Sequence, residues 1–217
     1  MGTALREWSG AWHFIAQIKW YIITTLLLFL LSTAGSWALF SHNELLTANV
    51  VSQIDELFES KNLYEEPEFD SAEPEGLRIN GVKLIASNLV AMATGMLLGL
   101  IPFLFLPALP LILNAAIIGA VGGGLSLAGV NPTGLFVLGV LPHGIFELSA
   151  LLFSYGMGFY LSLSLARLII RSRKSKPLLE VLKEIFRAFV WIVAPFTILA
   201  GLIEAYITPL LLAWFMP

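Results

Sequence analysis

Long apolar runs separated by short polar stretches dominate this chain. The first run, residues 20–40, has no charged residue, and its 21 residues match the roughly 20 that cross a bilayer as an α-helix. Further runs cover about residues 82–106, 111–130, 132–170 and 189–214. The first run exceeds the 7–15 apolar residues of a signal peptide, so we expect an uncleaved anchor. The pattern predicts an integral membrane protein with about five transmembrane helices.

The run over residues 132–170 is too long for a single crossing. At 1.5 Å per residue its helix would be about 58 Å long, twice the hydrocarbon thickness. Pro142 supplies a break. The expected fold is therefore all-α and polytopic, with about five transmembrane helices plus one re-entrant half-helix over 132–141, before a full crossing over 143–170.

Two segments outside the runs have their own patterns. Residues 1–19 are predicted to form an interfacial amphipathic segment, and the membrane domain follows over 20–217. The apolar stripe of the 1–19 segment consists of Leu5, Trp8, Trp12, Ile15 and Ile18. Residues 41–81 form an insertion, in which Ser41 and Glu44 resemble a capping box that opens a surface helix to about residue 62. The apolar stripe of that helix would be Leu46, Val50, Ile54, Leu57 and Phe58.

Composition and charge support this picture and orient it. The 217 residues are 58% hydrophobic and 12% charged, whereas a soluble domain has about 25% charged residues. The 41–81 insertion holds ten of the 15 acidic residues, while seven of the 12 basic residues crowd into 167–187. By the positive-inside rule, the N-terminus and the basic 171–187 loop are cytoplasmic, and an even number of crossings must separate them. Four crossings plus a half-helix satisfy this, and place 41–81 and the C-terminus outside the cell membrane.

Several kinds of chemistry are absent from the sequence. There is no cysteine, so disulfides, thiol nucleophiles and thiolate metal sites are excluded. The run Gly122-Gly123-Gly124 lacks the Lys-Ser/Thr of a phosphate loop. HExxH, GxSxG and paired-Asp motifs are also missing. We therefore expect no enzyme and no nucleic-acid partner.

A few polar residues fall at membrane depth, where each is costly and needs a reason. His143 and Glu147 are four residues apart, as are Glu204 and Thr208, so each pair shares a helix face. Asn88 and Asn114 are the other two. We expect His143, Glu147 and Glu204 to converge, with Asn88, Asn114 and Thr208 nearby, because an isolated carboxylate in the bilayer must be neutral, paired or bound to a cation.

The strings around these residues resemble the stage II sporulation protein M family. They are Pro142-His143-Gly144-Ile145-Phe146-Glu147-Leu148 and Ile203-Glu204-Ala205-Tyr206-Ile207-Thr208-Pro209, together with Asn88 and Asn114, each in a Gly-rich span. Ala115 departs from the pattern, since many members have Gly after the second Asn. The resemblance covers residues 82–214. It implies a membrane protein whose founding member acts in a septal complex with peptidoglycan-degrading partners.

Three functions are compatible with the sequence. In the first, the polar site binds or passes a proton or a divalent metal ion, with His143, Glu147 and Glu204 as ligands and zinc as a suitable cofactor. Alternatively, the same residues lock a non-enzymatic scaffold that recruits extracytoplasmic or cell-wall-remodelling partners. An intramembrane hydrolase is the third and least favoured reading. The expected partners are the lipid bilayer, anionic lipid at 171–187, an extracytoplasmic protein and a second copy of the chain.

Overall fold

The computed structural model of the protein describes residues 2–47, 64–65, 78–129, 131 and 133–215. These residues are almost all helical. The exception is a two-stranded antiparallel ribbon inside the acidic insertion, in which β1 (Tyr64–Glu65) pairs with β2 (Arg78–Ile79). Most of the predicted surface helix lies outside the described residues.

Five helical segments are long and apolar enough to cross a membrane, which confirms the predicted all-α polytopic fold. They are α2 (Lys19–Phe40), α4 (Gly81–Leu97) with the 3₁₀ turn η1 (Leu98–Leu100), α5 (Ala108–Leu127), the segment Phe136–Ile169, and the segment Leu178–Leu211. The last two contain 34 residues each, or about 51 Å of helix against about 30 Å of hydrocarbon. Part of each must therefore bend or lie outside the hydrocarbon layer.

Proline residues explain where these two long helices become irregular. The segment Phe136–Ile169 begins with a π-helical turn, η2 (Phe136–Val140), before α7 (Leu141–Ile169), and Pro142 sits two residues beyond that turn. The other segment repeats the arrangement twice. In it α8 (Leu178–Ala188), η3 (Phe189–Val193), α9 (Ala194–Leu202), η4 (Ile203–Ile207) and α10 (Thr208–Phe215) follow one another.

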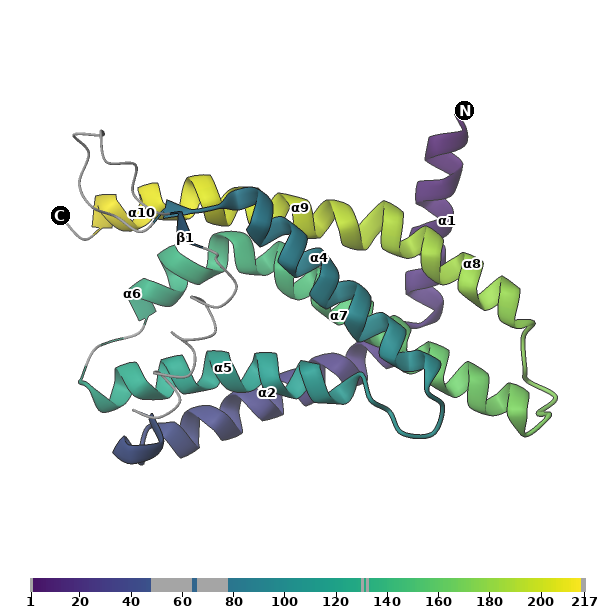
Figure 1. The fold of residues 1–217 in the computed structure, drawn as a ribbon, viewed down its shortest axis with the longest axis horizontal. Coiled ribbons are helices and arrows are strands. Elements are labelled where there is room, and N and C mark those ends of the chain that lie inside the picture. The colour runs from purple at the N-terminus through teal and green to yellow at the C-terminus, as the bar shows by residue number, and fades with distance from the viewer. Residues whose placement is uncertain (1, 48–63, 66–77, 130, 132, 216–217) are drawn as a thin grey trace.

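Pro195 follows η3 and Pro209 follows η4 at the same two-residue distance. A proline ring clashes with the carbonyl four residues earlier and offers no N–H to it, and a widened π turn relieves both problems. The short helix α6 (Thr133–Leu135) and η2 lead into α7 through a bend, as Figure 1 shows. Whether 132–141 re-enters from one side of the membrane stays a prediction.

Helix α7 forms the centre of the bundle. It packs against α9, α4 and α2, and the side chains of Tyr155, Met157 and Leu161 on it are almost fully buried. Glycines let neighbouring backbones approach: a Cβ on Gly99 would lie 2.1 Å from the carbonyl oxygen of Gly158. The buried Ser154 hydroxyl also donates to the carbonyl of Met92. Thus α4 lies along the helix that carries His143 and Glu147.

Helices α2 and α5 form a second close pair, which runs along the lower part of Figure 1. The glycines of α5 lie against the α2 backbone: a Cβ on Gly119 would lie 2.4 Å from the carbonyl oxygen of Thr33. Gly122 and Gly123 similarly face Trp37. This is the small-residue packing expected between membrane helices, where close van der Waals contact replaces the hydrophobic effect.

The N-terminal segment is a helix, α1 (Thr3–Gln17), and it packs against α8 and η3. Its buried side chains are Ala11, Phe14 and Ile15, whereas Leu5 and Trp8 of the predicted stripe are exposed. The helix that opens the insertion begins at Glu44, and its cap is Asn43 rather than Ser41. The Asn43 side chain accepts a hydrogen bond from the Leu46 amide at 3.2 Å, while the Ser41 hydroxyl donates to Ala38 of its own helix.

Candidate functional site

Three ionisable side chains from two distant parts of the chain meet inside the bundle. His143 and Glu147 lie one turn apart at the start of α7, and Glu204 lies in the π turn η4. Ligand atoms from the three side chains all lie within 4.8 Å of one another. Among the described residues, this is the only group of three His or acidic side chains with metal-binding spacing. The structure therefore brings together the three residues that the sequence predicts as ligands.

A hydrogen bond to Thr208 fixes the orientation of His143. The ring Nδ1 lies 3.3 Å from the Thr208 hydroxyl oxygen, and both side chains are buried. In a neutral imidazole one nitrogen carries a proton and the other a lone pair. If Nδ1–H donates to Thr208, the lone pair is on Nε2. In this tautomer Nε2 is free to bind a metal ion.

Local backbone geometry explains why these residues converge. Pro142 immediately precedes His143 in the first turn of α7, and Pro209 immediately follows Thr208 in the first turn of α10. Each proline ends a π turn, and such turns are frequent at functional sites because they redirect side chains. The widened turn η4 projects Glu204 while Thr208, one helical turn later, contacts His143.

The donor set is chemically suited to a divalent cation. One imidazole nitrogen and two carboxylates are ligands that zinc and similar ions accept. Ligands of a tetrahedral zinc are about 3.3 Å apart when its bonds are about 2.0 Å. Rotations of the half-buried Glu147 and Glu204 side chains would close the cluster from its present spacing. Two carboxylates also offset the charge of a divalent ion.

Asn88 lies on the face of α4 that packs toward the site. A stripe at intervals of three and four residues consists of Gly81, Ile85, Asn88, Met92, Gly95 and Gly99. At one end of this stripe, Gly81 faces Ala205 of η4, and a Cβ on Gly201 would lie 2.4 Å from Ile85. At the other end, Gly95 faces Tyr155 of α7. Asn88 occupies the middle of this stripe, between the helical segments that carry His143, Glu147 and Glu204.

Asn114 belongs to a different polar contact. Its amide donates to the carbonyl of Pro110 at 2.8 Å, and its side chain also lies close to the hydroxyl of Tyr155. Tyr155 lies eight residues beyond Glu147 on α7, which is about 12 Å along the helix axis. The structure therefore places Asn114 two turns away from the His143 cluster, at the contact between α5 and α7.

Tyr155 is the residue of this polar layer that the sequence pattern did not single out. Its side chain is only 1% exposed, and a buried tyrosine hydroxyl usually has a hydrogen-bond partner. A tyrosine in the middle of a predicted span was a visible signal in the sequence, but its contact with Asn114 was not.

Comparison with known proteins identifies the family. The model of the stage II sporulation protein M family matches residues 24–209, which include all six predicted site residues. No curated protein matches the chain, and no solved structure does. The match covers most of the membrane domain, from the first span to the proline that closes the candidate site. The chain therefore belongs to the stage II sporulation protein M family.

Proposed function

We propose that this protein binds a divalent metal ion, with zinc the best fit, at His143, Glu147 and Glu204 within its membrane domain. The observation that carries the proposal is the approach of the three ligand atoms to within 4.8 Å. Two carboxylates facing each other at membrane depth repel each other, and each is costly in that environment. A divalent cation removes both costs, and it leaves His143 neutral as a ligand.

The proposal extends to a role in ion passage or sensing. Irregular backbone at membrane depth is tolerated where it is buried in protein or lines a cavity. Two π turns, η2 and η4, flank this cluster, one on each of the bent helices that carry it. Binding is the step that sensing and passage share, so it is the first to measure. Zinc or proton flux into liposomes then separates passage from binding alone.

Elemental analysis of the purified protein tests the proposal directly. Wild-type protein in detergent is loaded with zinc and then exchanged into a buffer from which free metal has been removed. Its zinc content is measured by plasma mass spectrometry. We expect about one zinc per chain, and little in the Glu147→Gln/Glu204→Gln double variant, because a neutral amide is a poor zinc ligand. Glu44→Gln, an exposed acidic residue in the insertion, is the matched control. Equal zinc contents in the wild type and the double variant would refute the proposal.

A second candidate function is a non-enzymatic scaffold. The specific observation in its favour is the His143–Thr208 hydrogen bond, which joins α7 to α10 without any ion. In this case the polar residues hold two bent helices together, and the membrane domain presents the acidic insertion to an extracytoplasmic partner. A crosslinked partner lost on deletion of the insertion would favour the scaffold, as would a fully folded protein that never takes up metal.

We propose no catalytic role, because the sequence has none of the hydrolase motifs that would supply a nucleophile. Intramembrane hydrolysis would require the bound ion to activate water, and turnover of a membrane-protein substrate by the zinc-loaded protein would be its sign. Recruitment of anionic lipid by the 171–187 loop, and self-association of the chain, stay predictions from the sequence.

A further inference from the structure

A pocket lined by acidic and basic side chains lies between α1 and α8, and it shares no residue with the His143 cluster. Its charged lining consists of Glu7 from α1 and Glu180, Lys183, Glu184 and Arg187 from α8. Its apolar lining consists of Phe186, Val190 and Trp191. Two helices that the sequence separates by 160 residues thus build one pocket, and α1 packs directly on α8.

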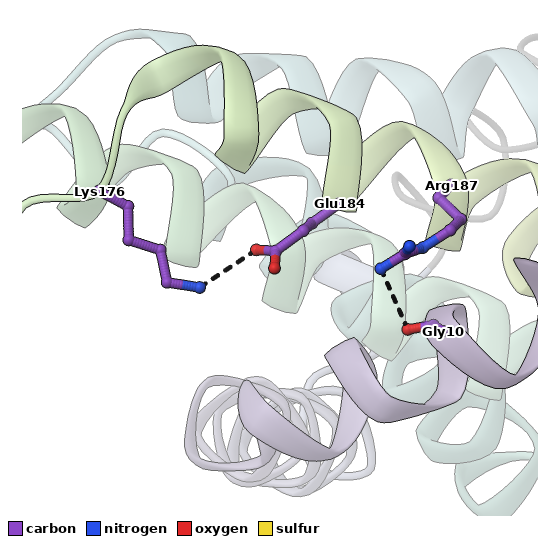
Figure 2. A network of polar contacts seen from close by, with 4 residues as sticks. All are labelled: Gly10, Lys176, Glu184 and Arg187. Atoms are coloured by element: carbon purple, nitrogen blue, oxygen red, sulfur yellow. Dashed lines mark hydrogen bonds and ion pairs between the residues drawn. The ribbon is translucent and has the colours of Figure 1, made fainter.

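Arg187 has unused hydrogen-bonding capacity in this pocket. One guanidinium nitrogen, Nη2, donates to the carbonyl of Gly10 at 3.3 Å, as Figure 2 shows. The Nε atom is buried and has no hydrogen-bond partner in the described part of the chain. Gly10 allows this approach, since a Cβ there would lie 2.9 Å from the guanidinium carbon. A guanidinium has five N–H donors, so the part of Arg187 that lines the pocket can still donate to an anionic ligand.

The charges of the pocket divide into an acidic and a basic pair. Glu184 already has a partner, because Lys176 lies 3.3 Å from its carboxylate (Figure 2). The remaining charged groups are Glu7 and Glu180, which are acidic, and Lys183 and Arg187, which are basic. The carboxylates, Glu7 and Glu180, are exposed and so is Lys183. A ligand that carries one phosphate and one ammonium group would meet both signs, whereas a purely anionic ligand would also meet two carboxylates.

Span length predicts that the pocket lies at headgroup level, and part of its wall is apolar. Residues 189–211, which are mostly apolar, supply about 34 Å of helix, enough to cross the hydrocarbon alone. The charged residues of α8 therefore fall just outside the hydrocarbon. Phe186 and Val190 line the pocket and are 70% and 42% exposed. They offer apolar contact to an acyl chain beside the charged groups.

We propose that this pocket binds the headgroup of a zwitterionic aminophospholipid such as phosphatidylethanolamine. The phosphate lies against Arg187 and Lys183, and the primary ammonium donates hydrogen bonds to Glu7 and Glu180. The acyl chains lie along Phe186 and Val190. Phosphatidylcholine is a weaker ligand because its quaternary ammonium has no N–H to donate, and phosphatidylglycerol is weaker because it has no cation.

Native mass spectrometry after reconstitution in an equimolar mixture of the three lipids tests this site. We expect the wild type to retain phosphatidylethanolamine preferentially. Lys183→Gln should weaken retention about tenfold, the effect of losing one charge-assisted hydrogen bond, and Lys183→Gln/Arg187→Gln should weaken it further. Lys174→Gln, an exposed basic residue of the adjoining loop outside the pocket lining, is the matched control and should not change it.

A charge-removal variant gives the sharper result. Glu7→Gln/Glu180→Gln leaves a pocket with two cations and only the paired Glu184, so the preference should move to phosphatidylglycerol. Both residues are exposed, and these changes should not disturb folding. Equal retention of all three lipids by the wild type would overturn the proposal, as would an unchanged preference in the Glu7→Gln/Glu180→Gln variant. Displacement of the lipid by water-soluble glycerophosphoethanolamine at matched concentration would instead identify a soluble ligand and overturn the lipid assignment.

Discussion

The imidazole Nδ1 of His143 lies 3.3 Å from the hydroxyl oxygen of Thr208, 65 residues further along the chain. This contact joins the first turn of α7 to the first turn of α10, and each of these turns contains a proline that ends a π turn. Because Glu147 and Glu204 lie one turn from the two bonded residues, the contact also sets how the carboxylates face each other. Thr208 is therefore a positioning residue for the candidate metal site.

Replacing Thr208 tests that positioning role. Thr208→Val keeps the shape of the side chain but removes the hydroxyl, so His143 loses the group that orients its ring. Loss of such an outer-shell partner typically lowers metal affinity about 10- to 100-fold. Thr208→Ser retains the hydroxyl and should bind zinc as the wild type does. Competition with a chromophoric zinc chelator measures both affinities, and equal values for Thr208→Val and the wild type would show that the hydroxyl has no role at the site.

Zinc should stabilise the folded protein through the same cluster. A ligand at 100 times its Kd adds about 2.7 kcal/mol to the free energy of unfolding. We expect zinc to raise the Tm of the wild type in detergent but not that of His143→Ala or of Glu147→Gln/Glu204→Gln. We expect all three proteins to be folded without the ion.

The same melting curves separate a metal site from a structural lock. If the cluster serves only to hold the helices, His143→Ala should be much less stable than either Glu→Gln single variant, because it leaves the carboxylates without their partner. Zinc would then move no Tm. That outcome would favour the scaffold function over the proposed metal site.

The glycines divide sharply into those that packing requires and those that it does not. Gly99 faces the backbone of Gly158, where an added Cβ has no room, so Gly99→Ala should cost about 1–3 kcal/mol through overpacking. Gly35, within α2, has nothing within 4 Å of such a Cβ. Gly35→Ala should be neutral or stabilising by up to about 1 kcal/mol, from helix propensity. Denaturation of the two variants in mixed micelles measures the difference, and similar effects would mean that the η1–α7 contact is loose.

The spans and the three residues of the cluster were accessible from the sequence because their physical signals are local. An apolar run of 20 residues is read directly, and an ionisable group inside one stands out. Span ends were less accurate: the second was expected to reach Leu106, but α4 and η1 end at Leu100, ahead of Pro102. The apolar loop that follows has no polar residue to mark the boundary.

Contacts between distant segments could not be read in the same way. The contact between Asn114 and Tyr155 depends on how α5 lies against α7, which no local pattern specifies. The α1–α8 pocket depends on the angle of α1, which follows from the burial of Phe14 and Ile15 rather than from the predicted stripe. The two π turns that shape the site follow from prolines, and the sequence indicated only a break at those positions.

Membrane orientation is the last prediction, and the chain is well suited to its test. It has no cysteine, so a single introduced cysteine is the only group that a maleimide reagent can label. Figure 1 places the end of α2 and the loop between α7 and α8 at opposite ends of the bundle. The charge distribution assigns the first of these ends to the outside and the second to the cytoplasm. In intact cells, Glu44→Cys should therefore react with an impermeant maleimide, and Ser172→Cys should react only after permeabilisation. Labelling of both from the same side would mean that residues 132–170 cross the membrane twice, because only a second full crossing there brings the two sites to one side. The half-helix would then be wrong, and the start of α7 with His143 would have to be placed at a different depth in the bilayer.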